Sequence, residues 1–172
     1  ECRKRSVRTL DLFLTRLAEL TKGALPDNFV ITLPKVTHPE QVTALADLLD
    51  IIEAKCGYAK NSLQLEIMIE TTQAIIDSKG SNQVLLLAEA ARGRCRSAIF
   101  GTYDYPATCN ITAAFQTHTH PASDFARHVL QVSLAGTGIT ICDGATTVMP
   151  IGPHKGARIM EMKVNHHPRR FG

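Results

Sequence analysis

The chain has 172 residues, a net charge of +3, 44% hydrophobic residues and 20% charged residues, which is typical of a soluble globular protein with one hydrophobic core. The charge is small and no basic block alternates with aromatic residues, so nucleic-acid binding is not indicated. No apolar run reaches the ~18 residues of a membrane span, and the opening ECRKRSVR lacks the apolar region of a signal peptide.

The first third of the chain predicts a helix, a strand and a second helix. Apolar residues at helical spacing predict an amphipathic helix over Val7–Leu20, which Gly23 and Pro26 end. The continuous apolar run Phe29–Leu33 is typical of a strand in a parallel sheet. A capping-box pattern at Thr37–Glu40 starts the next helix. The buried stripe of that helix comprises Val42, Leu45, Ala46, Leu49 and Ile52.

Strands and helices continue to alternate along the rest of the chain. The expected elements are a strand over Leu63–Glu70, a short helix from Thr71, a helix over Ser81–Arg92 stopped by Gly93, a strand over Ser97–Phe100, a long loop, a helix over Ser123–Leu134 and a strand over Ile139–Cys142. We treat residues 1–172 as a single domain, with an irregular tail over residues 155–172.

The spacing of the strands predicts an α/β fold with a parallel sheet covered by helices. Strand ends fall near positions 35, 70, 101 and 143, close to the ~31 residues per unit of a (β/α)₈ TIM barrel of ~250 residues. Only four strands are legible in the sequence, so we expect part of a barrel, its middle segment. The alternative is an open doubly wound sheet, although the chain has no Gly-rich phosphate loop to support nucleotide binding there.

Two acidic residues follow neighbouring strands of the expected sheet. Glu70 closes the strand LQLEIMIE, and Asp104 lies in the loop after the strand SAIF. Carboxylates at strand ends, with no sulfur ligand nearby, suit a hard cation such as Mg²⁺ or Mn²⁺. The alternative is that both acids cap the helices that follow, but the position at strand ends favours a site.

Side-chain alternation assigns Glu70 and Glu66 to the polar face of their strand, which would look into the barrel. A buried Glu66 needs a partner, and Lys35 at the end of the adjacent strand is a candidate. Lys35 is therefore either half of a structural ion pair at the barrel rim or a contact to substrate. We take it as the candidate catalytic residue.

The turn FGTYDY adds an expected anion site. Gly101 gives the backbone freedom, so that the amides of Thr102, Tyr103 and Asp104 converge on an anion. An anion beside a divalent cation describes a bound 2-oxo acid, with a metal that stabilises its enolate as a Lewis acid.

Three segments, FVITLPKVTHPEQV, LEIMIETTQAIID and AIFGTYDY, resemble the HpcH/HpaI aldolase and citrate lyase beta-subunit family of phosphoenolpyruvate/pyruvate-binding TIM barrels. The resemblance spans roughly residues 29–104. The opening RTLDLFL and the run ARHVLQVSLAGTGITICDGATTVMPIGPH resemble a less characterised branch of the same family. It implies that the metal ligands are Glu70 and Asp104. It also implies that the amides of Thr102 to Asp104 hold the carboxylate of the pyruvyl group.

The resemblance implies a metal-dependent carbon–carbon lyase that acts on a small-molecule 2-oxo acid or acyl-CoA substrate. Two alternatives remain at this point: a truncated, non-catalytic barrel fragment, and a phosphotransferase that uses phosphoenolpyruvate. The family's arginine for the substrate carboxylate normally lies on an earlier strand, which this sequence does not contain. We also expect a homo-oligomer.

Cysteines and histidines give weaker signals. The five cysteines form no CxxC pair, which indicates reduced thiols and a cytoplasmic protein. In an extended loop, His118 and His120 would project to the same side and could bind a metal, but the sequence shows no evident third ligand for zinc. Asp143, before Gly144, is interpreted as part of a turn rather than as a further site acid.

Overall fold

The computed structural model describes residues 2–146, and the tail expected over residues 155–172 lies outside them. In chain order the elements are α1 (Cys2–Thr21), β1 (Val30–Leu33), α2 (Pro39–Cys56), β2 (Gln64–Ile69), α3 (Thr72–Ile75), α4 (Val84–Glu89), β3 (Cys95–Phe100), α5 (Asp104–Thr108), the 3₁₀ helix η1 (Ala113–Phe115), α6 (Pro121–Leu134) and β4 (Thr140–Cys142). No helix within the described residues is both long enough and apolar enough to cross a membrane.

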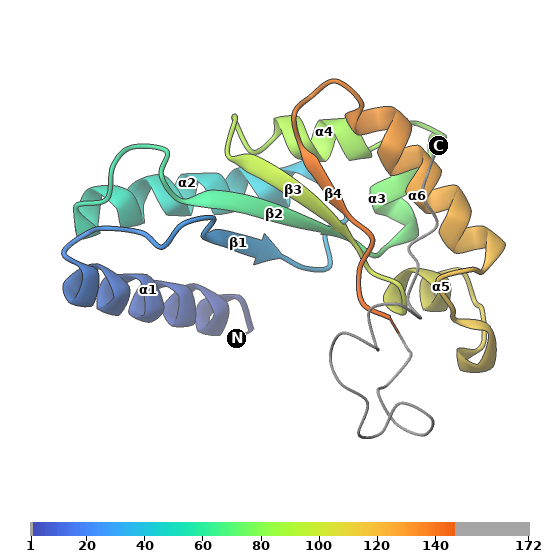
Figure 1. Cartoon of the computed structure of the whole chain (residues 1–172), viewed down its shortest axis with the longest axis horizontal. Helices are drawn as coiled ribbons and strands as arrows, with labels where there is room; N and C mark the ends of the chain where they lie inside the picture. The colour runs from blue at the N-terminus through green and yellow to red at the C-terminus, as the bar shows by residue number, and fades with distance from the viewer. Residues whose placement is uncertain (1, 147–172) are drawn as a thin grey trace, which may run out of the picture.

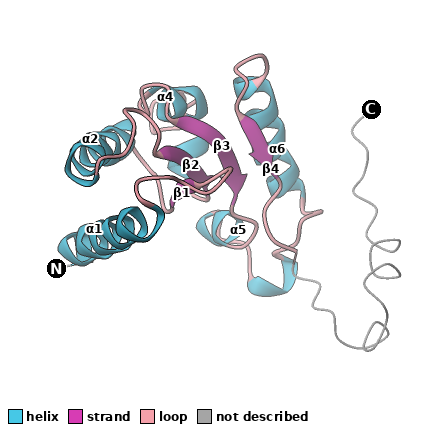
Figure 2. Cartoon of the chain, turned by 60° about the vertical axis from the view of Figure 1, so that its left-hand side comes forward, coloured by secondary structure: helices cyan, strands magenta, loops and turns pink. Residues whose placement is uncertain are grey.

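The four strands form one parallel sheet in the order β1-β2-β3-β4. Each strand therefore pairs with the next strand along the chain, and helices fill the connections (Figure 1). Figure 2 shows α1, α2, α4 and α6 following one another in an arc around the strands. A sequential strand order with an arc of helices is the arrangement of a barrel segment, whereas a doubly wound sheet reverses its strand order. The expected fold class, α/β with a parallel sheet covered by helices, is confirmed, and the strand order favours part of a (β/α)₈ barrel.

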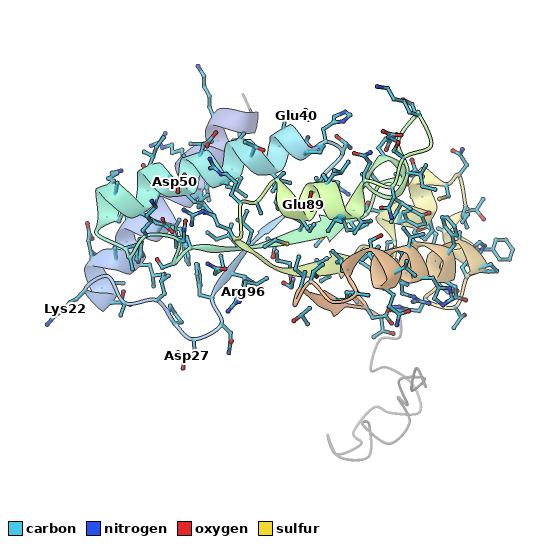
Figure 3. The ribbon with its side chains drawn as sticks, turned by 90° about the horizontal axis from the view of Figure 1, so that it is seen from above. Lys22, Asp27, Glu40, Asp50, Glu89 and Arg96 are labelled. Carbon is cyan, nitrogen blue, oxygen red and sulfur yellow. The ribbon has the colours of Figure 1, made fainter. Side chains whose placement is uncertain are left out.

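The two faces of the sheet differ as the alternation in β2 predicts. Leu65, Ile67 and Ile69 are fully buried and pack with the core residues of the helices. On the opposite, inner face, Gln64, Glu66 and Met68 are only half-buried. In Figure 3, Arg96 projects from β3 on the side of the sheet away from α2. The helices therefore cover one face of the described sheet and leave the inner face accessible.

A buried ion pair ties α2 to the amino-terminal ends of β2 and β3. The guanidinium of Arg94, 1% exposed, donates to both carboxylate oxygens of Glu53 at 2.6 and 2.8 Å and to the carbonyl of Leu63 at 2.9 Å. Glu53 also accepts from the amides of Asn61 and Leu63 at 2.9 and 2.8 Å. Asp50, labelled on α2 in Figure 3, pairs with Arg94 from the surface. These contacts lie at the end of the sheet opposite to the candidate site.

Several predicted boundaries differ from the structure for local reasons. α4 begins at Val84 rather than Ser81, because the Asp77 side chain accepts from the amides of Lys79 and Ser81 and holds a turn there. The loop after β3 contains α5 and η1, which were not predicted. The cap of α2 is shifted by one residue: His38 is the N-cap, and Gln41, rather than Glu40, accepts from its amide at 3.1 Å.

Candidate functional site

The predicted site residues lie at one edge of the sheet. Lys35 follows β1, Glu70 follows β2, and Gly101 to Asp104 follow β3. Because the strands are parallel and adjacent, their carboxyl ends meet at this edge, where ligand sites of parallel α/β folds lie. α5 begins at Asp104 and lies at the same end (Figure 1).

Glu70 is a buried acid held in a fixed orientation. Its side chain is 3% exposed, and its Oε1 accepts a hydrogen bond from the backbone N–H of Lys35 at 2.6 Å. Thr71, not Glu70, caps α3, because its hydroxyl accepts from the amide of Ala74. The interpretation of Glu70 as a helix cap is therefore excluded by its contacts.

The ammonium of Lys35 joins the two acids. Its Nζ lies 3.6 Å from Glu70 Oε2 and also forms an ion pair with Asp104 Oδ2. The Lys35 side chain is 60% exposed and the Asp104 side chain is 50% exposed, so both approach the buried Glu70 from the solvent side. Lys35 has a left-handed backbone conformation with φ +56°, which is unfavourable for residues other than glycine and which Lys22 and Arg92 also adopt. Glu70 and Asp104 therefore converge on one cationic group.

The environment separates the proton affinities of the two acids. Burial raises the pKa of Glu70 above its ordinary value, the Asp104 carboxyl raises it further, and Lys35 opposes both effects. For Asp104 the direction is reversed: the Lys35 ammonium lowers the pKa, and Glu70 adds to the lowering. Asp104 is consequently the more acidic member of the pair, and Glu70 holds its proton more tightly.

Gly101 allows β2 and β3 to approach closely at the site. A Cβ atom at this position would lie 2.3 Å from the Cβ of Glu70, and the glycine has no positive φ. The prediction that Gly101 is needed for backbone freedom is therefore wrong. Glycine is needed here because a larger residue would collide with Glu70.

The turn after Gly101 has the donors expected for an anion. Tyr105 N–H closes the turn onto the carbonyl of Gly101 at 3.1 Å. Within residues 2–146 the amides of Thr102, Tyr103 and Asp104 donate to no protein acceptor. Thr102 is 2% exposed, and its hydroxyl has no hydrogen-bond partner in the described part of the chain.

Glu66 is satisfied by residues other than Lys35, which corrects the expected pairing. Its carboxylate accepts from the hydroxyls of Thr32 at 2.9 Å and Ser97 at 2.7 Å. These three side chains cross β1, β2 and β3 on the inner face, because Thr32 and Ser97 are the register partners of Glu66. Lys35 is thus free of Glu66 and belongs to the Glu70–Asp104 pair.

Sequence reasoning missed a second group of contacts beside this edge. Arg127 on α6 pairs with Asp143 at 3.2 Å and with Asp124, and its guanidinium lies 5.9 Å from the centroid of the Phe100 ring. Asp143 is therefore an anchor between β4 and α6. The following Gly144, with φ +83°, passes so close to β3 that a Cβ would lie 2.1 Å from the carbonyl oxygen of Phe100.

The two histidines of the QTHTHP loop make structural contacts. His118 Nε2 lies 2.6 Å from the carbonyl oxygen of Ala145, and His120 Nδ1 accepts from the amide of Ala122 at the start of α6. No group of three or more His, Cys, Asp or Glu side chains suited to a metal occurs among the described residues. A zinc site of that kind is therefore absent from this part of the chain.

The Glu70–Asp104 pair suits a different class of metal site. Mg²⁺ is usually held by one or two carboxylates together with water and substrate oxygens, rather than by a complete protein cage. Two carboxylates that converge on one cationic group, one of them buried and fixed by a backbone amide, meet this description. The residues present fit Mg²⁺ or Mn²⁺.

Comparison with solved structures shows the same fold. A citrate lyase from Burkholderia xenovorans LB400 superposes with a TM-score of 0.55 and 19% identity, over 65% of this chain and 34% of that chain. Malate synthase of Haloferax volcanii, in a ternary complex with pyruvate and acetyl-CoA, gives a TM-score of 0.57 and 18% identity, over 78% and 35%. The lead(II) complex of that malate synthase gives 0.55 and 17%, over 76% and 36%. The chain thus spans about a third of the length of these proteins.

The sequence comparisons identify a family. No curated protein sequence matches the chain significantly. A model of the family described as "Domain of unknown function (DUF6986)" matches residues 1–170, so the chain belongs to this family.

Proposed function

We propose that this protein is a metal-dependent carbon–carbon lyase of the aldolase or citrate lyase type, which acts through the enolate of a 2-oxo acid or acyl-CoA substrate. The observation that carries the proposal is the convergence of Glu70 and Asp104 on one cationic group at the carboxyl edge of the sheet. Glu70 and Asp104 are the proposed ligands of Mg²⁺ or Mn²⁺.

Two likenesses support the proposed reaction class. The segments that carry Lys35, Glu70 and Asp104 resemble the HpcH/HpaI aldolase and citrate lyase beta-subunit family in order and spacing. The fold is that of a citrate lyase and of a malate synthase whose structures contain pyruvate with acetyl-CoA and, separately, lead(II). A 2-oxo acid and a divalent cation are therefore the ligands that we propose for the carboxyl edge of this sheet.

Each residue has a distinct task in the proposed reaction. The amides of Thr102 to Asp104 bind the substrate carboxylate and fix its orientation, since they are otherwise without protein acceptors in the described structure. The amide of Lys35 keeps Glu70 oriented, and the Lys35 ammonium adds positive charge beside the reacting group. A bound Mg²⁺ or Mn²⁺ supplies Lewis-acid stabilisation of the charge that develops on the enolate oxygen.

The proposal is tested in the natural full-length protein with Mn²⁺. Two readouts apply: exchange of the methyl protons of pyruvate in D₂O, followed by NMR, and release of pyruvate from 4-hydroxy-2-oxo acids. Asp104→Asn keeps the turn but removes a negative charge, and losing one well-placed electrostatic contact typically lowers a rate by ~10²–10³. Asp27→Asn, in the α1–β1 connection labelled in Figure 3, is the matched control and leaves both rates unchanged.

The same experiment separates the alternatives. If the protein binds Mn²⁺ but catalyses neither reaction, the aldolase assignment fails for these substrates. Phosphoryl transfer from phosphoenolpyruvate under those conditions would assign a phosphotransferase instead. If Mn²⁺ does not bind, the non-catalytic barrel becomes the better description.

A further inference from the structure

Lys35 lies where a cation bound by Glu70 and Asp104 would lie. Its Nζ is within 4 Å of Glu70 Oε2 and of Asp104 Oδ2, which are oxygens of the two proposed ligands. Mg²⁺ binds carboxylate oxygens at ~2.0–2.1 Å, and a second positive charge so close to it is repelled. The ammonium and a divalent cation therefore exclude each other from this position.

We propose that the Lys35 ammonium is a built-in cation of the Glu70–Asp104 pair, that a divalent cation displaces it, and that only the displaced form binds the anionic substrate. This inference rests on the proposed metal site and adds a fixed order of binding to it. The substrate class is a small monocarboxylate such as a 2-oxo acid.

The exposure of Lys35 and the burial of Glu70 permit a divalent cation to replace the ammonium. Lys35 is 60% exposed and Glu70 only 3%, so the ammonium enters the pair from solvent and leaves without opening the core. The hydrogen bond from the Lys35 backbone N–H to Glu70 Oε1 is independent of the side chain. Glu70 therefore stays oriented toward the pair when the ammonium leaves.

The exchange reverses the charge of the site. As ionised groups, Glu70, Asp104 and Lys35 together carry one net negative charge, which disfavours an incoming carboxylate. With a divalent cation added, the same three side chains and the cation carry one net positive charge. The amides of Thr102 to Asp104 then receive a carboxylate in a favourable field.

Mn²⁺ affinity, measured by electron paramagnetic resonance on the natural full-length protein, tests the displacement. Lys35→Met removes the competing charge and keeps the length of the side chain, so it binds Mn²⁺ ~10-fold or more tightly than the wild type. Lys35→Arg keeps the charge and binds Mn²⁺ about as weakly as the wild type. Lys60→Met is the matched control: it removes an equal charge in the loop before β2, at the opposite end of the sheet, and should leave the Mn²⁺ affinity unchanged.

Pyruvate binding, followed by saturation-transfer NMR, tests the order. The wild type should bind pyruvate with Mg²⁺ present and at least ~10-fold more weakly without it. Lys35→Met should bind pyruvate more weakly than the wild type at saturating Mg²⁺, although it binds metal more tightly. A purely structural role of Lys35 does not produce these opposite effects.

Two results overturn the inference while the proposed metal site stands. One is that Lys35→Met binds Mn²⁺ with wild-type or lower affinity while the wild type itself binds it. The other is that metal-free wild type binds pyruvate as tightly as the metal-loaded protein. If neither wild type nor Lys35→Met binds Mn²⁺, the proposed metal site and this inference both fail.

Discussion

At the scale of single residues, the contact between Gly101 and Glu70 sets the geometry of the site. A Cβ on residue 101 would lie 2.3 Å from the Glu70 Cβ, an atom directly attached to the backbone that has little room to move. Gly101→Ala should therefore destabilise the fold by ~1–3 kcal/mol, as overpacking does, and should also displace Glu70. We expect a lower midpoint of urea unfolding and weaker Mn²⁺ binding.

Gly57→Ala is the control for this prediction. Gly57 has φ +75° but no atom within 4 Å of an added Cβ, so its substitution costs only the left-handed backbone strain, ~1–2 kcal/mol. Stability should fall while Mn²⁺ affinity stays at the wild-type value. Equal Mn²⁺ affinity in Gly101→Ala and wild type would show that the close approach does not position Glu70.

At the scale of elements, the Glu53–Arg94 pair joins α2 to the amino-terminal ends of two strands. Burial alone would raise the pKa of Glu53, but Arg94 and the amides of Leu63 and Asn61 lower it below its ordinary value of 4.5. A carboxyl whose pKa is lower in the folded state than in the unfolded state stabilises the protein at pH values above the unfolded-state pKa. This stabilisation is lost progressively as the pH falls below about 4.5.

Glu53→Gln removes the buried carboxylate partner of Arg94 and leaves Arg94 its pair with Asp50 at the surface. Breaking a buried pair typically costs ~3–5 kcal/mol, and the remaining pair with Asp50 places the expected loss at the lower end of that range. Chemical denaturation at pH 7 should show this loss, and the difference from wild type should shrink as the pH falls below about 4.5. Glu19→Gln, in the exposed pair with Arg16, should change stability by less than ~1 kcal/mol. A Glu53→Gln protein as stable as wild type at pH 7 would contradict the assigned role.

At the scale of the whole molecule, the described sheet exposes surfaces that a complete barrel covers. Thr32, Thr140 and Cys142 are exposed on its inner face, and β1 and β4 are edge strands. α1 adds large exposed apolar side chains, among them Leu12, Phe13 and Leu20. Open strand edges and apolar patches promote association.

Residues 1–172 produced alone should therefore self-associate or aggregate. Sedimentation velocity over a range of protein concentrations measures this association. A monodisperse monomer of residues 1–172 that melts cooperatively would contradict the prediction that these surfaces need further cover.

The sequence predicted those features that depend on periodicity. Alternation in Leu63–Glu70 correctly separated the buried Leu65 from the half-buried Glu66, and the four strand positions followed from apolar runs. Parallel order then brought Lys35, Glu70 and Asp104 to one edge, because the ends of adjacent parallel strands meet.

Contacts that depend on side-chain packing could not be predicted from the sequence. Glu66 was assigned to Lys35, whereas the strand register gives it Thr32 and Ser97. The role of Arg94 needs the position of α2 relative to β2 and β3, which no local pattern encodes. The Asp–Gly pair at 143–144 suggested a turn, but the structure uses its glycine for a close approach to Phe100.

Mn²⁺ binding to the natural full-length protein tests the central claim most directly. Wild type should bind one Mn²⁺ per chain, and Glu70→Gln and Asp104→Asn should each weaken binding by ~10²-fold or more, since even outer-shell changes cost 10–100-fold. The double variant should lose less than the sum of the two effects on free energy, because both changes disable one site. Equal Mn²⁺ affinity in wild type and all three variants would show that Glu70 and Asp104 hold no metal.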